Sequence, residues 1–118
     1  MSVTAMSWYC FRVDRPRQAE IVAENLLALA RDPLTQSLVT PDVQVYRRRE
    51  NGAELFYFSP AAFLYFKPFI ATYQGTPCDQ PVPTHDQHEL RRLSLKADLG
   101  WQTIPPGGLP LEDGDFPH

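Results

Sequence analysis

Two strand-like runs, 43–50 and 53–58, flank the pair Asn51-Gly52 and predict a β-hairpin. Asn-Gly suits a two-residue type I′ turn, because both central residues of that turn need positive φ. A turn of known length fixes the register of the two strands. The predicted partners are Glu50 with Ala53, Arg49 with Glu54, Arg48 with Leu55, Arg47 with Phe56, Tyr46 with Tyr57 and Val45 with Phe58.

This register divides the hairpin into two faces, because side chains alternate along a strand. One face is the predicted core face, with charged residues toward its rim: Val43, Val45, Phe56 and Phe58, then Arg47 and the pair Arg49 and Glu54. The other face carries Gln44, Tyr46, Arg48, Leu55 and Tyr57. It is more aromatic than a solvated sheet surface needs to be.

An earlier strand is predicted around residues 3–13, which are rich in aromatic residues. Alternation places Tyr9, Phe11 and Val13 on one face and Trp8, Cys10 and Arg12 on the other. A helix follows, for which Asp14 is the expected N-cap and Pro16 suits the first turn. Its apolar stripe consists of Val22, Leu26, Leu29 and Ala30, with Glu20, Glu24 and Arg31 opposite. Pro33 ends it.

A second helix is predicted from Ser59-Pro60 toward Tyr73, with Gly75 as its stop. Its apolar arc is wider than the ~100° stripe that a surface helix needs to dock on one sheet. Pro68 removes a backbone donor and should kink this helix or end it early.

Residues beyond Pro77 allow two interpretations. Asp86–Glu89 resembles a capping box before a helix, whereas residues 93–99 alternate as a strand does. We favour a strand at 92–98, because it completes the order β, α, β, β, α, β. That order predicts an α+β, two-layer sandwich of ferredoxin-like type, a four-stranded antiparallel sheet with two helices on one face.

The length of 118 residues fits one domain, predicted at 1–100. Residues 104–118 hold four prolines, three glycines, three acidic residues and no lysine or arginine. Such a composition buries little, so residues 101–118 are expected to form an extended or disordered C-terminal arm. No secretory signal is recognisable at the start, and the apolar stretch 53–73 is interrupted by charges and prolines. A soluble, cytoplasmic protein is the default expectation.

Several chemistries find no support in the sequence. The net charge of −3 argues against a dedicated, strongly basic nucleic-acid binder. The one metal-like cluster matches no established zinc spacing and fits an ordinary polar loop: Cys78, Asp79, His85, Asp86 and His88. Neither cysteine has a recognisable base for nucleophilic catalysis, and a disulfide between them is allowed but not required. Gly107-Gly108 lies among prolines and makes no phosphate loop. We therefore expect no metal, no cofactor and no assigned catalytic residue.

The run Arg47-Arg48-Arg49, with Tyr46 and Tyr57, resembles the aromatic and basic sheet face of RNA-recognition folds. Only Arg48 shares a face with the two tyrosines, however, and no matching glycine-aromatic motif occurs. A strand edge protected from aggregation by charge explains the run as well.

The predicted fold leaves one sheet face bare, and the residues expected there are Tyr46, Arg48, Leu55, Tyr57 and Trp8. An exposed aromatic patch marks an interface. The favoured function is therefore a non-enzymatic interaction or regulatory module that forms a homodimer or binds a protein partner through this face. The alternative is a small enzyme or ligand carrier in which two such sheets enclose a pocket, with Arg48 pairing an acidic ligand and a tyrosine acting as acid or hydrogen-bond donor.

Overall fold

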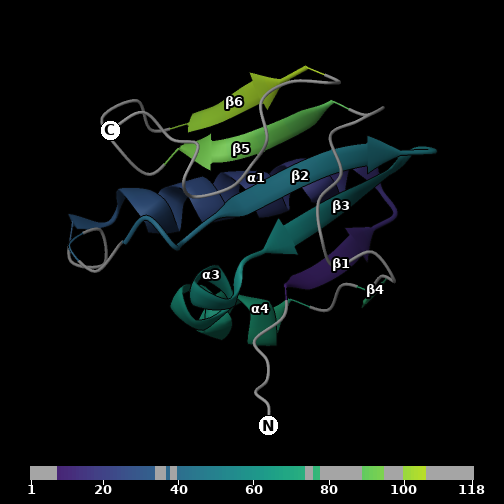
Figure 1. The fold of residues 1–118 in the computed structure, drawn as a ribbon. Coiled ribbons are helices and arrows are strands. Elements are labelled where there is room, and N and C mark those ends of the chain that lie inside the picture. Colours follow the sequence, from purple (N-terminus) through teal and green to yellow (C-terminus); the bar gives the residue numbers. More distant parts are fainter. Residues whose placement is uncertain are drawn as a thin grey trace, which may run out of the picture.

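The computed structural model describes residues 8–33, 37, 40–73, 76–77, 89–94 and 100–105. Figure 1 shows the elements along the chain. They are β1 (Tyr9–Val13), α1 (Pro16–Arg31), β2 (Val45–Glu50), β3 (Ala53–Phe58), α3 (Pro60–Tyr65), α4 (Lys67–Thr72), β4 (Thr76–Pro77), β5 (Leu90–Ser94) and β6 (Gly100–Ile104).

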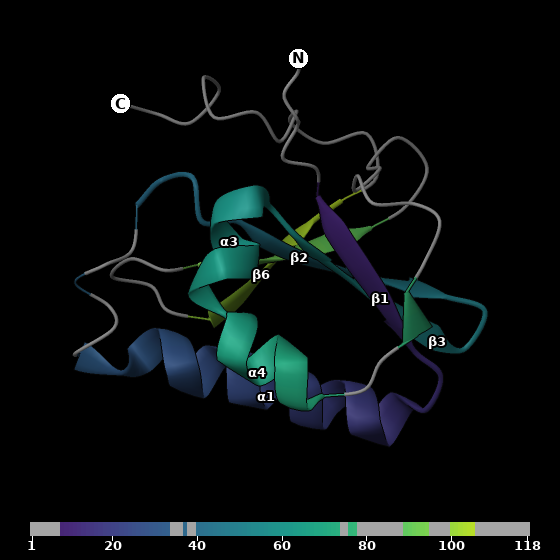
Figure 2. The same cartoon turned by 90° about the horizontal axis from the view of Figure 1, so that it is seen from below.

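The strands form one antiparallel sheet in the order β4-β1-β3-β2-β5-β6. In Figure 2, α1 and α4 lie below the sheet and α3 lies beside it, and apolar residues of all three helices join one core with the sheet. The architecture is therefore α+β, with a helical layer over one face. Among the described helices, none is long and apolar enough to cross a membrane.

The prediction of a four-stranded, ferredoxin-like sheet with two helices is wrong. The described chain has six strands and three helices. The strand β5 begins two residues before the strand expected at 92–98 and covers its residues 92–94, and β6 pairs with it. Residues 95–98 lie outside the described part of the chain. Pairing with β5 satisfies backbone groups of β2 that would otherwise form a sheet edge. The strand β6 takes residues 100–104, and residues 106–118 of the predicted arm lie outside the described part of the chain.

The predicted hairpin register is confirmed from Val45 opposite Phe58 to Glu50 opposite Ala53. Asn51 and Gly52 have φ values of 50° and 84°. Both are positive, as a type I′ turn requires. The predicted division of β1 into two faces is confirmed too, since Phe11 and Val13 belong to the core beneath the helices whereas Cys10 does not.

The predictions for the two helix N-caps are confirmed only in part. Ser59 caps α3 as expected, and its side chain accepts a hydrogen bond from the backbone N–H of Ala62. The expected N-cap Asp14 is wrong, because Arg15 occupies that position without a side-chain cap bond. The carboxylate of Asp14 instead lies 3.0 Å from Arg12. The predicted second helix is interrupted at Phe66, two residues before Pro68.

The main core fills the space between the helices and the sheet. Apolar residues of α1 and of α3 and α4 meet aromatic residues of β1 and β3 there, including Phe11, Phe56 and Phe58. Trp101 of β6 packs at the edge of this core and donates its indole N–H to the backbone oxygen of Ala23 at 3.2 Å. This bond anchors the outermost strand to α1. Leu29, predicted in the buried stripe, is 37% exposed.

Candidate functional site

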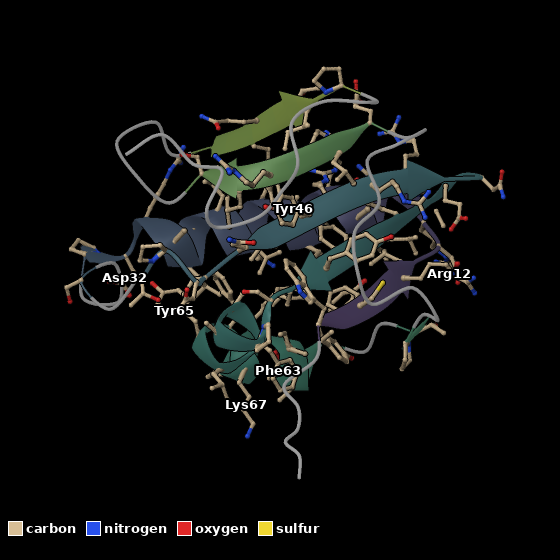
Figure 3. The ribbon with its side chains drawn as sticks, in the orientation of Figure 1. Arg12, Asp32, Tyr46, Phe63, Tyr65 and Lys67 are labelled. Atoms are coloured by element: carbon tan, nitrogen blue, oxygen red, sulfur yellow. The ribbon has the colours of Figure 1, made fainter. Side chains whose placement is uncertain are left out.

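The residues proposed from the sequence lie on the sheet face opposite the helices, which we call the distal face. Tyr46, Leu55 and Tyr57 form a buried cluster there with Cys10, and Trp8 and Ile104 pack against it. Figure 3 labels Tyr46 at the middle of the sheet. The five predicted site residues thus lie on one face, as expected from the hairpin register.

The distal face is not bare, and the expectation of an exposed patch is wrong. Tyr46 and Tyr57 are 0% exposed, and Arg48 and Leu55 are each 2% exposed. The sequence predicted which face these residues occupy, because alternation decides that. It did not predict their burial, because whether other parts of the chain shield a sheet face is a long-range property that no local pattern encodes.

Hydrogen bonds connect the polar groups of the distal face. The Nε of Arg48 donates to the hydroxyl of Tyr57 at 3.3 Å, and an Nη atom of Arg48 lies 3.7 Å from Glu50. The hydroxyl of Tyr46 donates to the side-chain oxygen of Gln44 at 3.5 Å. The rings of Trp8 and Tyr46 are 5.8 Å apart between centroids, at a tilt of 34°. These contacts make a buried cluster of mixed aromatic and cationic character.

Burial has a clear effect on Tyr57. Removal from water raises the pKa of its phenol above 10.0, and this effect exceeds the opposing influence of the hydrogen bond from Arg48. The phenol is therefore neutral at ordinary pH and acts as a hydrogen-bonding group. The raised pKa makes Tyr57 a weaker proton donor, which counts against the acid role in the alternative hypothesis but not against the hydrogen-bonding role.

A second charged cluster lies on the helix side of the sheet, and sequence reasoning placed it only at the rim of the core. Arg47, 2% exposed, donates from Nε to Glu54 at 2.7 Å and from Nη2 to Glu20 of α1 at 2.9 Å. Glu54, 3% exposed, also accepts from Arg91 at 3.2 Å. The guanidinium carbon of Arg47 lies 5.2 Å from the centre of the Trp101 ring.

This cluster joins elements that are distant in sequence. The Arg47 and Glu54 pair crosses the hairpin diagonally, Glu20 comes from α1, and Arg91 comes from β5. The hairpin register could have signalled the first pair, since both side chains fall on the core face two positions apart. The contributions of Glu20 and Arg91 depend on tertiary packing. The geometry is that of a structural ion-pair network, in which Glu54 contacts Arg47, Arg49 and Arg91, and Glu20 contacts Arg47.

The structure describes Cys10 but not the metal-like loop that the sequence analysis considered. Cys10 is disulfide-bonded, so it is not a free nucleophile. The only other cysteine in the sequence is Cys78. Cys78 and the remaining metal-like residues at 79–88 lie outside the described residues. Within the described ranges, no group of three or more potential metal ligands occurs.

Comparison with known proteins gives no match: no family model, no curated protein and no solved structure is similar to this chain.

Proposed function

We propose that this protein is a small non-enzymatic interaction or regulatory module that binds its partner through the distal face. The observation that supports the proposal is the one-sided placement of the helices. α1, α3 and α4 all pack into the core on one face of the sheet, and the aromatic and cationic cluster occupies the other face. Among the described elements, none forms a second layer over that cluster.

The composition of the cluster suits a protein partner. Tyrosine, tryptophan and arginine are the residues enriched at the energetic centres of protein interfaces. Tyr46, Tyr57 and Trp8 supply large rigid rings, and Arg48 supplies a planar cation that carboxylates bind with two hydrogen bonds. A second copy of this chain is the partner we favour, since homodimers are the commonest assemblies of small soluble proteins.

Burial within the single chain sets a condition on binding. Because Tyr46 and Tyr57 are fully shielded, a partner reaches them only when the distal face opens locally. Local openings of lower free energy than global unfolding are common in proteins. The proposal therefore predicts that amide hydrogens of β2 exchange through local opening and become slower to exchange when the partner is bound.

The oligomeric state tests the proposal with a matched pair of variants. Gln102 is exposed on β6. It pairs with Arg92 of β5, which in turn pairs with Tyr46 of β2, so all three side chains lie on the distal face. Gln18 is exposed on α1, in the helical layer. Sedimentation equilibrium should show a dimer for the wild type and for Gln18→Lys, and a weakened dimer for Gln102→Lys. A wild-type monomer with β2 amides exchanging only by global unfolding would refute the proposal.

One observation favours a second function, a carrier of a small acidic ligand. Arg48 is buried beside the Tyr57 hydroxyl, and a buried guanidinium is a strong site for a carboxylate. Mass spectrometry of the intact protein under non-denaturing conditions separates the two functions. A small acid that stays bound, and is lost in Arg48→Gln, supports the carrier, whereas a dimeric mass without added ligand supports the interaction module.

The expected cytoplasmic location stays a prediction, and the disulfide at Cys10 argues against it. Stable disulfides form in oxidising compartments and are rare in the cytosol, where thiols are kept reduced. Alkylation of free thiols during rapid lysis, followed by reduction and labelling of the released thiols with a second reagent, tests this point. If Cys10 carries the first label, it is reduced in the cell and the cytoplasmic location is supported.

A further inference from the structure

The arginines are concentrated in a few neighbouring segments. Eight of the nine arginines in the sequence lie in β1, the start of α1, β2 and β5. The sheet register explains why these segments meet: β1 ends opposite Glu54, next to the hairpin turn, and the second residue of β5 is opposite Arg47. α1 starts three residues after β1. Arg12, labelled in Figure 3, marks this end of the sheet.

Four of these arginines form a surface that we call the arginine-rich end: Arg15, Arg17, Arg49 and Arg91. Arg15 and Arg17 are exposed, and the side chains of Arg49 and Arg91 are 67% and 26% exposed. None of the four belongs to the distal cluster. A ligand at this surface would therefore be distinct from the partner of the distal face.

Positive charge exceeds negative charge at the arginine-rich end. The carboxylate of Glu54 lies 2.7 Å from Arg47, 3.2 Å from Arg91 and 3.7 Å from Arg49. The carboxylate of Glu54 thus contacts three guanidinium groups, and Glu20 is directed at the same Arg47. The other two acids at this end, Asp14 and Glu50, are paired with Arg12 and Arg48 and not with the four arginines of the surface. The closest contacts belong to buried Arg47, so the exposed Arg49 is left with only the longest of them.

The start of α1 adds cations where a helix ordinarily has acids. Arg15 is the N-cap and makes no side-chain cap bond, Arg17 lies in the first turn, and that turn contains no acidic residue. The N-terminal end of a helix carries partial positive charge and favours carboxylates. Two arginines there repel the helix dipole in the isolated chain, and an anion placed among them would relieve that repulsion.

We propose that the arginine-rich end binds an extended acidic segment of another polypeptide. β1 and β5 are separated by two strands, which spans roughly 14 Å at the usual strand spacing. An extended peptide of about four residues covers that distance. Each of its carboxylates would form two hydrogen bonds with one guanidinium group, a bidentate geometry for which arginine is better suited than lysine.

The surface suits an acidic peptide better than a nucleic acid. Proteins that bind single strands combine cations with exposed aromatic rings on which bases stack. Phe56, the aromatic residue opposite Arg47 on this side of the sheet, is fully buried. The whole chain also has a net charge of −3, which opposes binding of a long polyanion.

Binding of a fluorescent oligo-glutamate peptide tests the proposal, with fluorescence anisotropy as the readout. The wild type should bind the peptide, and the affinity should fall as salt rises. Arg17→Gln/Arg49→Gln should weaken binding by about fivefold, since each removes an exposed ion pair with the peptide. The control Arg31→Gln/Lys67→Gln removes the same charge from exposed sites elsewhere and should change the affinity by less than about twofold.

Three outcomes would overturn the proposal: no saturable binding of the peptide, an equal loss in both double variants, or displacement of the peptide by a single-stranded oligonucleotide at lower concentration than by unlabelled oligo-glutamate. Circular dichroism checks that each variant is folded. Arg17→Gln alone should fold at least as stably as the wild type, because it removes a cation from the positive end of α1. It should still weaken binding by about twofold.

Discussion

Arg47 offers the sharpest test of how the sheet and α1 are held together. Arg47→Met removes a guanidinium that is 2% exposed and leaves Glu54, 3% exposed, without its closest partner. Removal of one member of a buried ion pair typically costs 3–5 kcal/mol. Arg91 remains 3.2 Å from Glu54, so we expect the lower part of that range, about 3 kcal/mol.

A matched control is available two residues along the same strand. Arg49 reaches the same carboxylate at 3.7 Å, but its side chain is 67% exposed. Exposed ion pairs contribute about 0–1 kcal/mol, so Arg49→Met should change the free energy of unfolding by less than about 1 kcal/mol. The double variant Arg47→Met/Glu54→Leu should recover most of the stability lost in Arg47→Met, because it leaves no uncompensated buried carboxylate.

Urea denaturation followed by circular dichroism measures all four proteins, with unchanged m-values as the sign of a comparable unfolding reaction. The reasoning is refuted if Arg47→Met costs no more than Arg49→Met. It is also refuted if the free energy of unfolding of the double variant lies below that of Arg47→Met by as much as an independent core substitution would cost.

Three further predictions concern single side chains. Burial raises the pKa of Tyr57 above its ordinary value of 10.0. The stability associated with the neutral phenol is therefore complete below pH 10.0 and is lost as the pH rises through the pKa of the folded state. In urea titrations, Tyr57→Phe should lose less stability than the wild type between neutral and strongly alkaline pH. Gly52→Ala should cost about 1 kcal/mol in the same assay, from the positive φ alone, because no atom lies within 4 Å of the added Cβ. Ser59→Ala should cost about 1–3 kcal/mol, since its buried hydroxyl caps α3 and also accepts from the backbone of Gln44; a midpoint within error of the wild type would contradict it.

Local chemistry determined the parts of the fold that the sequence predicts well. The Asn51-Gly52 turn needs only the conformational preference of two residues, and it fixed six cross-strand pairs. The Ser59 cap and the interruption before Pro68 likewise follow from a hydroxyl and an imino nitrogen. Each of these features depends on residues within a few positions of one another.

Features that depend on distant segments were missed. The sequence 100–104 has a mixed composition and lies beside prolines, and it is a strand because β5 pairs with it and Trp101 reaches the backbone of Ala23. One local feature was missed as well: the α1 start was assigned to Asp14, whose carboxylate instead pairs with Arg12, two residues earlier. For the candidate site, alternation gave the correct face for Tyr46 and Tyr57 but not their burial, which depends on the whole chain.

Arg47 and Arg48 are neighbours along β2, yet each is buried on a different side of the sheet. If β2 shifted by one position, a guanidinium would still enter each side at this point, so charge alone discriminates poorly between the correct alignment and its nearest error. The correct alignment of β2 is therefore selected by the neighbouring aromatic residues and by the tight reversal at the end of the strand. Lengthening that reversal by one residue should therefore yield a mixture of two aligned forms rather than a simple loss of stability.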